Sequence, residues 1–177
     1  MSKNFFRTSD NNPKNIQIRK NIINHFVTEG NDTIAELAKL LDLSVPTVTK
    51  FISELTENGF LMEYGKIQTN GGRHPLLYGL NPSSVYFVGA DMTRHHLSIA
   101  LMNFRGDIVS HQMGIQYTFE NTPESFDTLC GHIQDFIDKT GSLKDKVYNI
   151  NLNISGRVNP ESGYSYSHFF FSEEPIS

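Results

Sequence analysis

The sequence lacks the features that mark secreted, disulfide-bonded or membrane proteins. Its only cysteine among 177 residues is Cys130, which excludes an internal disulfide framework and a cysteine-based zinc site. The apolar runs are only a few residues long and cannot span a bilayer, and residues 1–15 lack the apolar core of a signal peptide. We therefore expect a cytoplasmic protein with no membrane partner, no metal and no cofactor.

Positive charge is also scarce, and the charge is unevenly distributed. The net charge is −4; residues 1–80 hold nine basic and eight acidic residues, a net of +1, whereas residues 81–177 hold six and eleven, a net of −5. A nearly neutral front half does not by itself indicate nucleic-acid binding, but a neutral module can bind DNA when its few cations share one face. The apolar content of 38% suits a globular chain.

The front of the chain has the pattern of a small helical domain. Apolar residues recur at helical spacing over residues 13–28, interrupted by Arg19, and predict a first helix. Thr33 and Glu36 form a capping box for a short second helix. Residues 1–12 are expected to be a flexible arm.

A third helix is predicted from Ser44, a natural N-cap, with Pro46 in the first turn where no backbone donor is lost. At about 100° per residue one side of this helix is apolar, with Val45, Val48, Phe51, Ile52 and Leu55. The opposite side carries Pro46, Lys50 and Ser53, flanked by Thr47, Thr49 and Glu54.

Two short helices joined by a tight turn indicate a helix-turn-helix, in which the start of the second helix enters the DNA major groove. Small, hydroxylated and basic side chains suit that position because they allow close approach and offer partners to phosphates and base edges. The candidate DNA contacts on this helix are Ser44, Pro46, Thr47, Thr49, Lys50 and Ser53. The alternative is a solvated face on a structural bundle.

The segment after the third helix favours DNA contact. Two apolar runs, residues 60–64 and 76–80, flank the turn-rich stretch "NGGR", which predicts a β-hairpin. A hairpin directly after a recognition helix is a wing, and Arg73 and His74 at its tip are candidates for a groove or phosphate contact. The alternative for Arg73 is an ordinary loop cation. We assign residues 13–81 to this winged helix-turn-helix domain.

The periodicity changes after the turn "NPSS", and a second domain is expected over residues 85–177. Strands are predicted at 85–90, 97–101, 108–117 and 148–154, with a helix from Pro123 to Lys139 before the last of them. Cys130 lies at an apolar position of this helix and is expected to be a buried small hydrophobe. The order β-β-β-α-β suits the first half of a ribonuclease-H-like, actin-like ATPase-type domain, so the chain as a whole is predicted to be α+β.

Three stretches together resemble the repressor branch of the ROK family (repressor, open reading frame, kinase). "ELAKLLDLSVPTVTKFISELTENGFLMEYG" is similar to the family's winged helix-turn-helix, "GGRHPLLYGLN" to its wing and linker, and "VGADMTRHHLSIALMNFRGDIV" with "NISGRVNPESGY" to the opening of its sugar-binding domain. The resemblance covers nearly the whole chain. It implies an oligomeric transcriptional regulator of carbohydrate metabolism that binds an operator in double-stranded DNA and responds to a sugar or sugar phosphate.

The departures from the family bear on the alternatives. Asp91 is followed by "MTR" rather than by the glycine-rich phosphate turn of the family's kinases, so no enzymatic activity is expected, and a sugar kinase with an added DNA module is the alternative. A winged helix that contacts only proteins is another. The resemblance places most sugar contacts after Ser177, which implies a truncated chain without measurable sugar binding; Asp91, Ser155 and Gly156 are candidates for the edge of the effector site.

Overall fold

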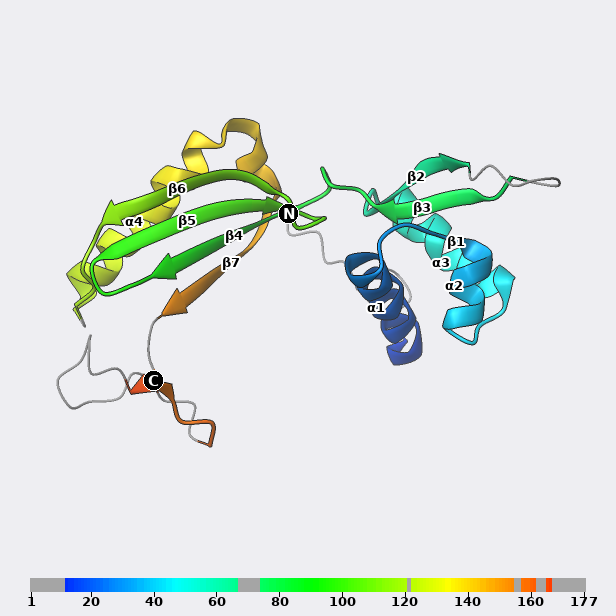
Figure 1. The fold of residues 1–177 in the computed structure, drawn as a ribbon, viewed down its shortest axis with the longest axis horizontal. Coiled ribbons are helices and arrows are strands. Elements are labelled where there is room, and N and C mark those ends of the chain that lie inside the picture. The colour runs from blue at the N-terminus through cyan, green and yellow to red at the C-terminus, as the bar shows by residue number, and fades with distance from the viewer. Residues whose placement is uncertain (1–11, 67–73, 121, 155–156, 162–164, 167–177) are drawn as a thin grey trace. The chain divides into compact units, whose positions relative to one another are not determined.

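The computed structural model describes residues 12–66, 74–120, 122–154, 157–161 and 165–166. Backbone contacts divide the chain into two compact units, residues 1–85 and residues 86–177. Figure 1 shows helices and a small sheet in the first unit, and a larger sheet with one long helix in the second. In the described residues, no helix is both long and apolar enough to cross a membrane.

The first unit begins with the helices α1 (Pro13–Thr28), α2 (Ile34–Leu40) and α3 (Val45–Glu57). Each starts at a polar cap: the side chains of Asn12, Thr33 and Ser44 accept hydrogen bonds from backbone N–H groups of the first turns. Asp42 adopts a positive φ of 52° in the turn between α2 and α3, so the chain reverses within a few residues. The predicted helices and helix-turn-helix geometry are thus present.

The core of this unit is apolar and draws on every helix and on the strands that follow. Its fully or nearly fully buried apolar side chains are Ile18, Ile22, Ile23, Phe26, Leu37, Ala38, Val48, Phe51, Ile52, Leu55, Phe60, Leu61 and Leu80. Val27, which helical spacing places on the apolar stripe of α1, is instead 60% exposed.

One charged pair lies inside this core. Arg19 is only 1% exposed, its Nε donates to Glu54 Oε1 at 2.9 Å and its Nη2 to Glu54 Oε2 at 3.2 Å, and its guanidinium carbon lies 5.3 Å from the centre of the Phe51 ring. Glu54, predicted to flank the exposed face of the third helix, is half-buried with 22% of its side chain exposed. The carboxylate turns inward because the apolar stripe of α1 has a cation at its centre that must be neutralised when buried.

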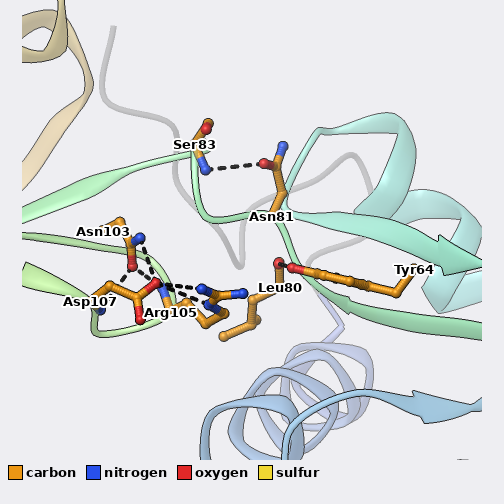
Figure 2. A network of polar contacts seen from close by, with 7 residues as sticks. All are labelled: Tyr64, Leu80, Asn81, Ser83, Asn103, Arg105 and Asp107. Carbon is orange, nitrogen blue, oxygen red and sulfur yellow. Dashed lines mark hydrogen bonds and ion pairs between the residues drawn. The ribbon is translucent and has the colours of Figure 1, made fainter. Parts of the chain in front are cut away.

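A small antiparallel sheet, of order β1-β3-β2, completes the unit: β1 (Asp32–Thr33), β3 (Leu76–Leu80) and β2 (Leu61–Lys66). The sequence predicted the β2–β3 pair but missed β1, whose two residues are too few to show alternation. The Tyr64 hydroxyl donates to Leu80 O at 2.7 Å, a contact visible in Figure 2. The Asn81 side chain donates to Gly59 O at 2.9 Å and so fastens the segment after β3 to the end of α3.

The second unit is a four-stranded sheet with the order β6-β5-β4-β7. Its strands are β4 (Tyr86–Met92), β5 (His96–Asn103), β6 (Ile108–Gln116) and β7 (Val147–Ile154); α4 (Pro123–Lys139) and the 3₁₀ helix η1 (Gly141–Lys146) precede β7, and the short strands β8 (Arg157–Val158) and β9 (Ser165–Tyr166) follow it. The first three strands are antiparallel and β7 joins β4 in parallel. This is the predicted β-β-β-α-β order, to which the β8–β9 pair is an unpredicted addition.

The helix α4 lies across one face of this sheet (Figure 1). Together they bury Tyr86, Val88, Ala90, Met92, Leu97, Ile99, Leu101, Tyr117, Leu129, Ile133, Phe136 and Ile137. Cys130 is exposed and Phe126 is 54% exposed, so the expectation of a buried cysteine was wrong. A single helix contacts the sheet only along one line, so the side of α4 that packs is narrower than the stripe of apolar positions on the helix.

The strand β7 is poorly covered. Ile150 pairs in register with Val88 and Leu152 with Ala90, yet Ile150 is 46% and Leu152 39% exposed while their β4 partners are buried.

The turn between β5 and β6 is held by side chains: Asp107 Oδ2 accepts from Asn103 Nδ2 at 2.9 Å and from Arg105 Nη2 at 2.8 Å (Figure 2). These bonds, the Asn103 amide foremost, lower the pKa of Asp107 below its ordinary value.

Candidate nucleic-acid interface

The start of α3 is an exposed surface built by its own cap. Ser44 has extended backbone angles, and its Oγ accepts from the Thr47 backbone N–H at 3.3 Å. Pro46 then occupies a position where a missing N–H costs no helical bond. Of the predicted contacts, Ser44, Pro46, Thr49, Lys50 and Ser53 are exposed and Thr47 is half-buried.

One residue of α3 lies on a different side from the one predicted. Val45 is 51% exposed, although its spacing places it with the buried residues Val48, Ile52 and Leu55. At the first helical position there is no preceding turn, and no other element covers the side chain. Val45 therefore joins the outward surface of the helix.

A groove of about 610 Å³ lies beside this surface, between the start of α3, the start of α2 and the turn end of the β2–β3 strand pair. Its described lining residues are Thr33, Ile34, Ala35, Val45, Thr49, Lys66, His74, Pro75, Leu76 and Tyr78. The groove thus brings together the predicted contacts Thr49 and His74, which lie far apart in the sequence, with Lys66, which the sequence did not single out.

Its polar groups come from separate elements. Lys66 at the end of β2 and His74 before β3 are both exposed, so the lysine cation and the imidazole are on the hairpin side and Thr49 on the helix side. Tyr78 donates to Glu63 Oε1 at 3.5 Å, and its pKa is raised, first by burial and then by the negative charge of Glu63. Its hydroxyl is therefore a neutral hydrogen-bonding group at physiological pH.

The remaining candidate residues are placed only in part. Arg73 lies outside the described residues, as do Ser155 and Gly156. Asp91 is exposed on β4 and accepts a hydrogen bond from Asn153 Nδ2 of the neighbouring strand β7. Among the described residues, no group of three or more His, Cys, Asp or Glu side chains could hold a metal ion.

Comparison with known proteins agrees with this geometry. Residues 17–62 match the family model "Winged helix-turn-helix DNA-binding". The xylose repressor of Caldicellulosiruptor bescii is 26% identical over 128 residues, which are 72% of this chain and 32% of that protein; the xylose repressor of Bacillus subtilis is also 26% identical, over 72% and 33%. A crystal structure of a ROK family transcriptional regulator, a homologue of the E. coli MLC protein, superposes with a TM-score of 0.65 at 20% identity, over 87% of this chain and 39% of the other.

The chain is thus similar in sequence to xylose repressors and in fold to a ROK family transcriptional regulator. The expected family resemblance and the α+β fold, a winged helix-turn-helix followed by the start of an actin-like ATPase-type domain, are confirmed. The chain spans about a third of the length of the repressors that it matches. DNA and a sugar can therefore only be proposed as ligands for this chain.

Proposed function

We propose that the chain is the operator-binding part, and the beginning of the sensor part, of a transcriptional repressor of sugar metabolism. The observation that carries the proposal is the exposed start of α3 beside the groove that the β2–β3 hairpin closes. In a winged helix-turn-helix, this helix enters the major groove and the hairpin contacts the adjacent backbone or minor groove.

The proposed interface uses the few cations of a nearly neutral domain. Lys50 lies on the exposed side of α3 and Lys66 at the turn end of the hairpin, with Arg73 assigned to the same interface from sequence. His74 lies beside Lys66 in the groove as a further polar group. Phosphate contacts from such residues supply affinity for any sequence. Residues Ser44, Pro46, Thr47, Thr49 and Ser53 form the surface that faces the bases.

The test measures the affinity of the chain for DNA duplexes by fluorescence anisotropy, at several salt concentrations, with the DNA upstream of the coding sequence as probe. If Lys50 contacts a phosphate, Lys50→Ala should weaken binding to every duplex and lower the salt slope by about one unit. Lys139→Ala, an exposed cation on α4 of the other unit, is the matched control and should change neither quantity. Unchanged affinity and slope in Lys50→Ala would remove this residue from the interface, and no binding to any duplex would favour a protein-interaction module instead.

The partners proposed for the whole protein are a second copy of itself and a sugar. Two recognition helices that contact paired half-sites require a two-fold axis, so a homo-oligomer is expected. Two of the relatives are named xylose repressors, which makes xylose the first sugar to test. We propose no reaction, and a phosphoryl-transfer assay with ATP and a panel of sugars would reveal a kinase.

A further inference from the structure

The hydroxyl groups at the start of α3 are largely engaged within the helix itself. Thr49 Oγ1 donates to the backbone oxygen of Val45 at 2.8 Å. Ser44 Oγ and Thr47 Oγ1 lie 2.7 Å apart in a mutual hydrogen bond, and Ser44 Oγ also accepts from the Thr47 backbone N–H. The Ser44–Thr47 pair keeps one hydroxyl proton for an outside partner, whereas the hydroxyl proton of Thr49 is used.

This bonding changes what Thr49 can offer to a bound molecule. With Oγ1 turned back along the helix toward Val45 O, the heavy atom left at its Cβ to face outward is the Cγ2 methyl group. Thr49 is exposed and lines the groove. It therefore has an apolar contact to offer outward but no hydroxyl proton to donate, and its Oγ1 can only accept.

Val45 extends the same apolar surface. It lies one helical turn before Thr49, is 51% exposed, and lines the same groove. Single exposed apolar residues are common and need no explanation, but here the methyl groups of Val45 and Thr49 adjoin on one face, and the pyrrolidine ring of Pro46 is exposed beside them. The start of α3 thus presents hydrocarbon from Val45, Pro46 and Thr49 beside its hydroxyl groups.

We propose that Val45 and Thr49 determine sequence specificity by contact with the C5-methyl groups of thymines in the major groove. Thymine is the base that presents a methyl group there, and apolar side chains such as a threonine methyl are its recognised partners. The two residues lie about 6 Å apart along the helix axis, so the thymines fall within about two base steps of each other. The inference rests on the proposed DNA binding and adds which base is selected and by what chemistry.

The first experiment removes methyl groups from the DNA alone. Duplexes are enriched from a random pool with the wild-type chain, and each thymine in turn is replaced by deoxyuridine, which keeps every hydrogen bond and loses only the C5-methyl. At one or two positions the affinity should fall about three- to fivefold, the value expected for one buried methyl group. Deoxyuridine at the other positions is the internal control and should have no effect.

The second experiment separates the methyl of Thr49 from its hydroxyl. Thr49→Val keeps the methyl and loses the hydroxyl, so it should retain wild-type affinity and sensitivity to deoxyuridine. Thr49→Ser keeps the hydroxyl and loses the methyl, so it should bind about three- to fivefold more weakly and lose the sensitivity at one thymine. Val45→Ala should lose the sensitivity at the other, and circular dichroism of each variant checks that α3 still folds.

The outcomes distinguish the two levels of the argument. If a duplex is enriched but deoxyuridine is tolerated at every position, or Thr49→Val loses affinity and Thr49→Ser does not, the methyl contact is refuted while DNA binding stands. If no duplex is enriched, the proposed function itself fails, and the specificity inference fails with it.

Discussion

The pairing of Arg19 with Glu54 predicts that a single uncharged substitution on α3 will destabilise the first unit. Glu54→Gln removes the negative charge but nearly keeps the size of the side chain. The Arg19 guanidinium, 1% exposed, would then be a buried charge that has lost the carboxylate that neutralises it. Such a charge costs far more than the loss of one hydrogen bond.

The magnitude follows from where the two ends of the pair lie. Breaking a buried ion pair on one side costs about 3–5 kcal/mol, whereas an exposed pair contributes about 0.2–1 kcal/mol. Because the Glu54 side chain keeps 22% of its exposure and Arg19 almost none, we expect the lower end of the buried range, about 3 kcal/mol. Arg19→Met combined with Glu54→Gln removes both charges and should recover most of this loss, since apolar replacements of buried pairs are often nearly neutral.

Amide hydrogen exchange measures this loss locally, which matters in a chain of two units. Backbone amides of α1 and α3 should exchange roughly 100-fold faster in Glu54→Gln, the factor that corresponds to about 3 kcal/mol. Amides of α4 and the large sheet should be unaffected and serve as the internal reference. Lys144→Ala, which breaks the exposed pair between Lys144 and Asp138 (3.1 Å), should leave exchange unchanged throughout. Acceleration in Glu54→Gln no larger than in Lys144→Ala would refute the view that burial makes the pair essential.

Three further outcomes are expected from the packing. Gly79→Ala should destabilise the first unit by about 1–3 kcal/mol, because a Cβ at Gly79 would overlap the Asn31 side chain. Gly89→Ala is the control, since nothing lies within 4 Å of the position of its Cβ. Equal urea midpoints for the two variants would contradict the clash. The isolated chain should self-associate through the poorly covered strand β7, so light scattering should give a mass above 20.1 kDa that Ile150→Lys lowers; a wild-type monomer would exclude this. Burial raises the pKa of Tyr117, so the stabilisation from its neutral phenol is complete below about pH 10 and is lost as the pH rises through the higher pKa of the folded state. Tyr117→Phe should therefore reduce alkaline unfolding. An unchanged alkaline transition in this variant would argue against the burial effect.

Local chemistry in the sequence was sufficient to predict most of the secondary structure. The helices α1 and α4 begin and end at the predicted residues, because a polar cap, a proline in the first turn and helical spacing all lie within the helix or next to it. The hairpin β2–β3 and the order of the large sheet followed from alternation and turn residues in the same way. The positions of the candidate contacts in the first turns of α3 were likewise predictable, since the cap at Ser44 decides where the helix begins; that they touch DNA stays a prediction.

Only the tertiary structure decided which apolar and charged positions are covered. Spacing places Val45 and Cys130 on apolar faces, yet both are exposed, because burial depends on whether another element lies opposite. Arg19 and Glu54 are 35 residues apart, and no local pattern indicates that they meet. The groove beside α3 also depends on the tertiary structure, because Thr49 and His74 come from elements that only the folded chain brings together. The sequence alone singled out each of the two as a candidate contact, but it did not determine that they lie close together.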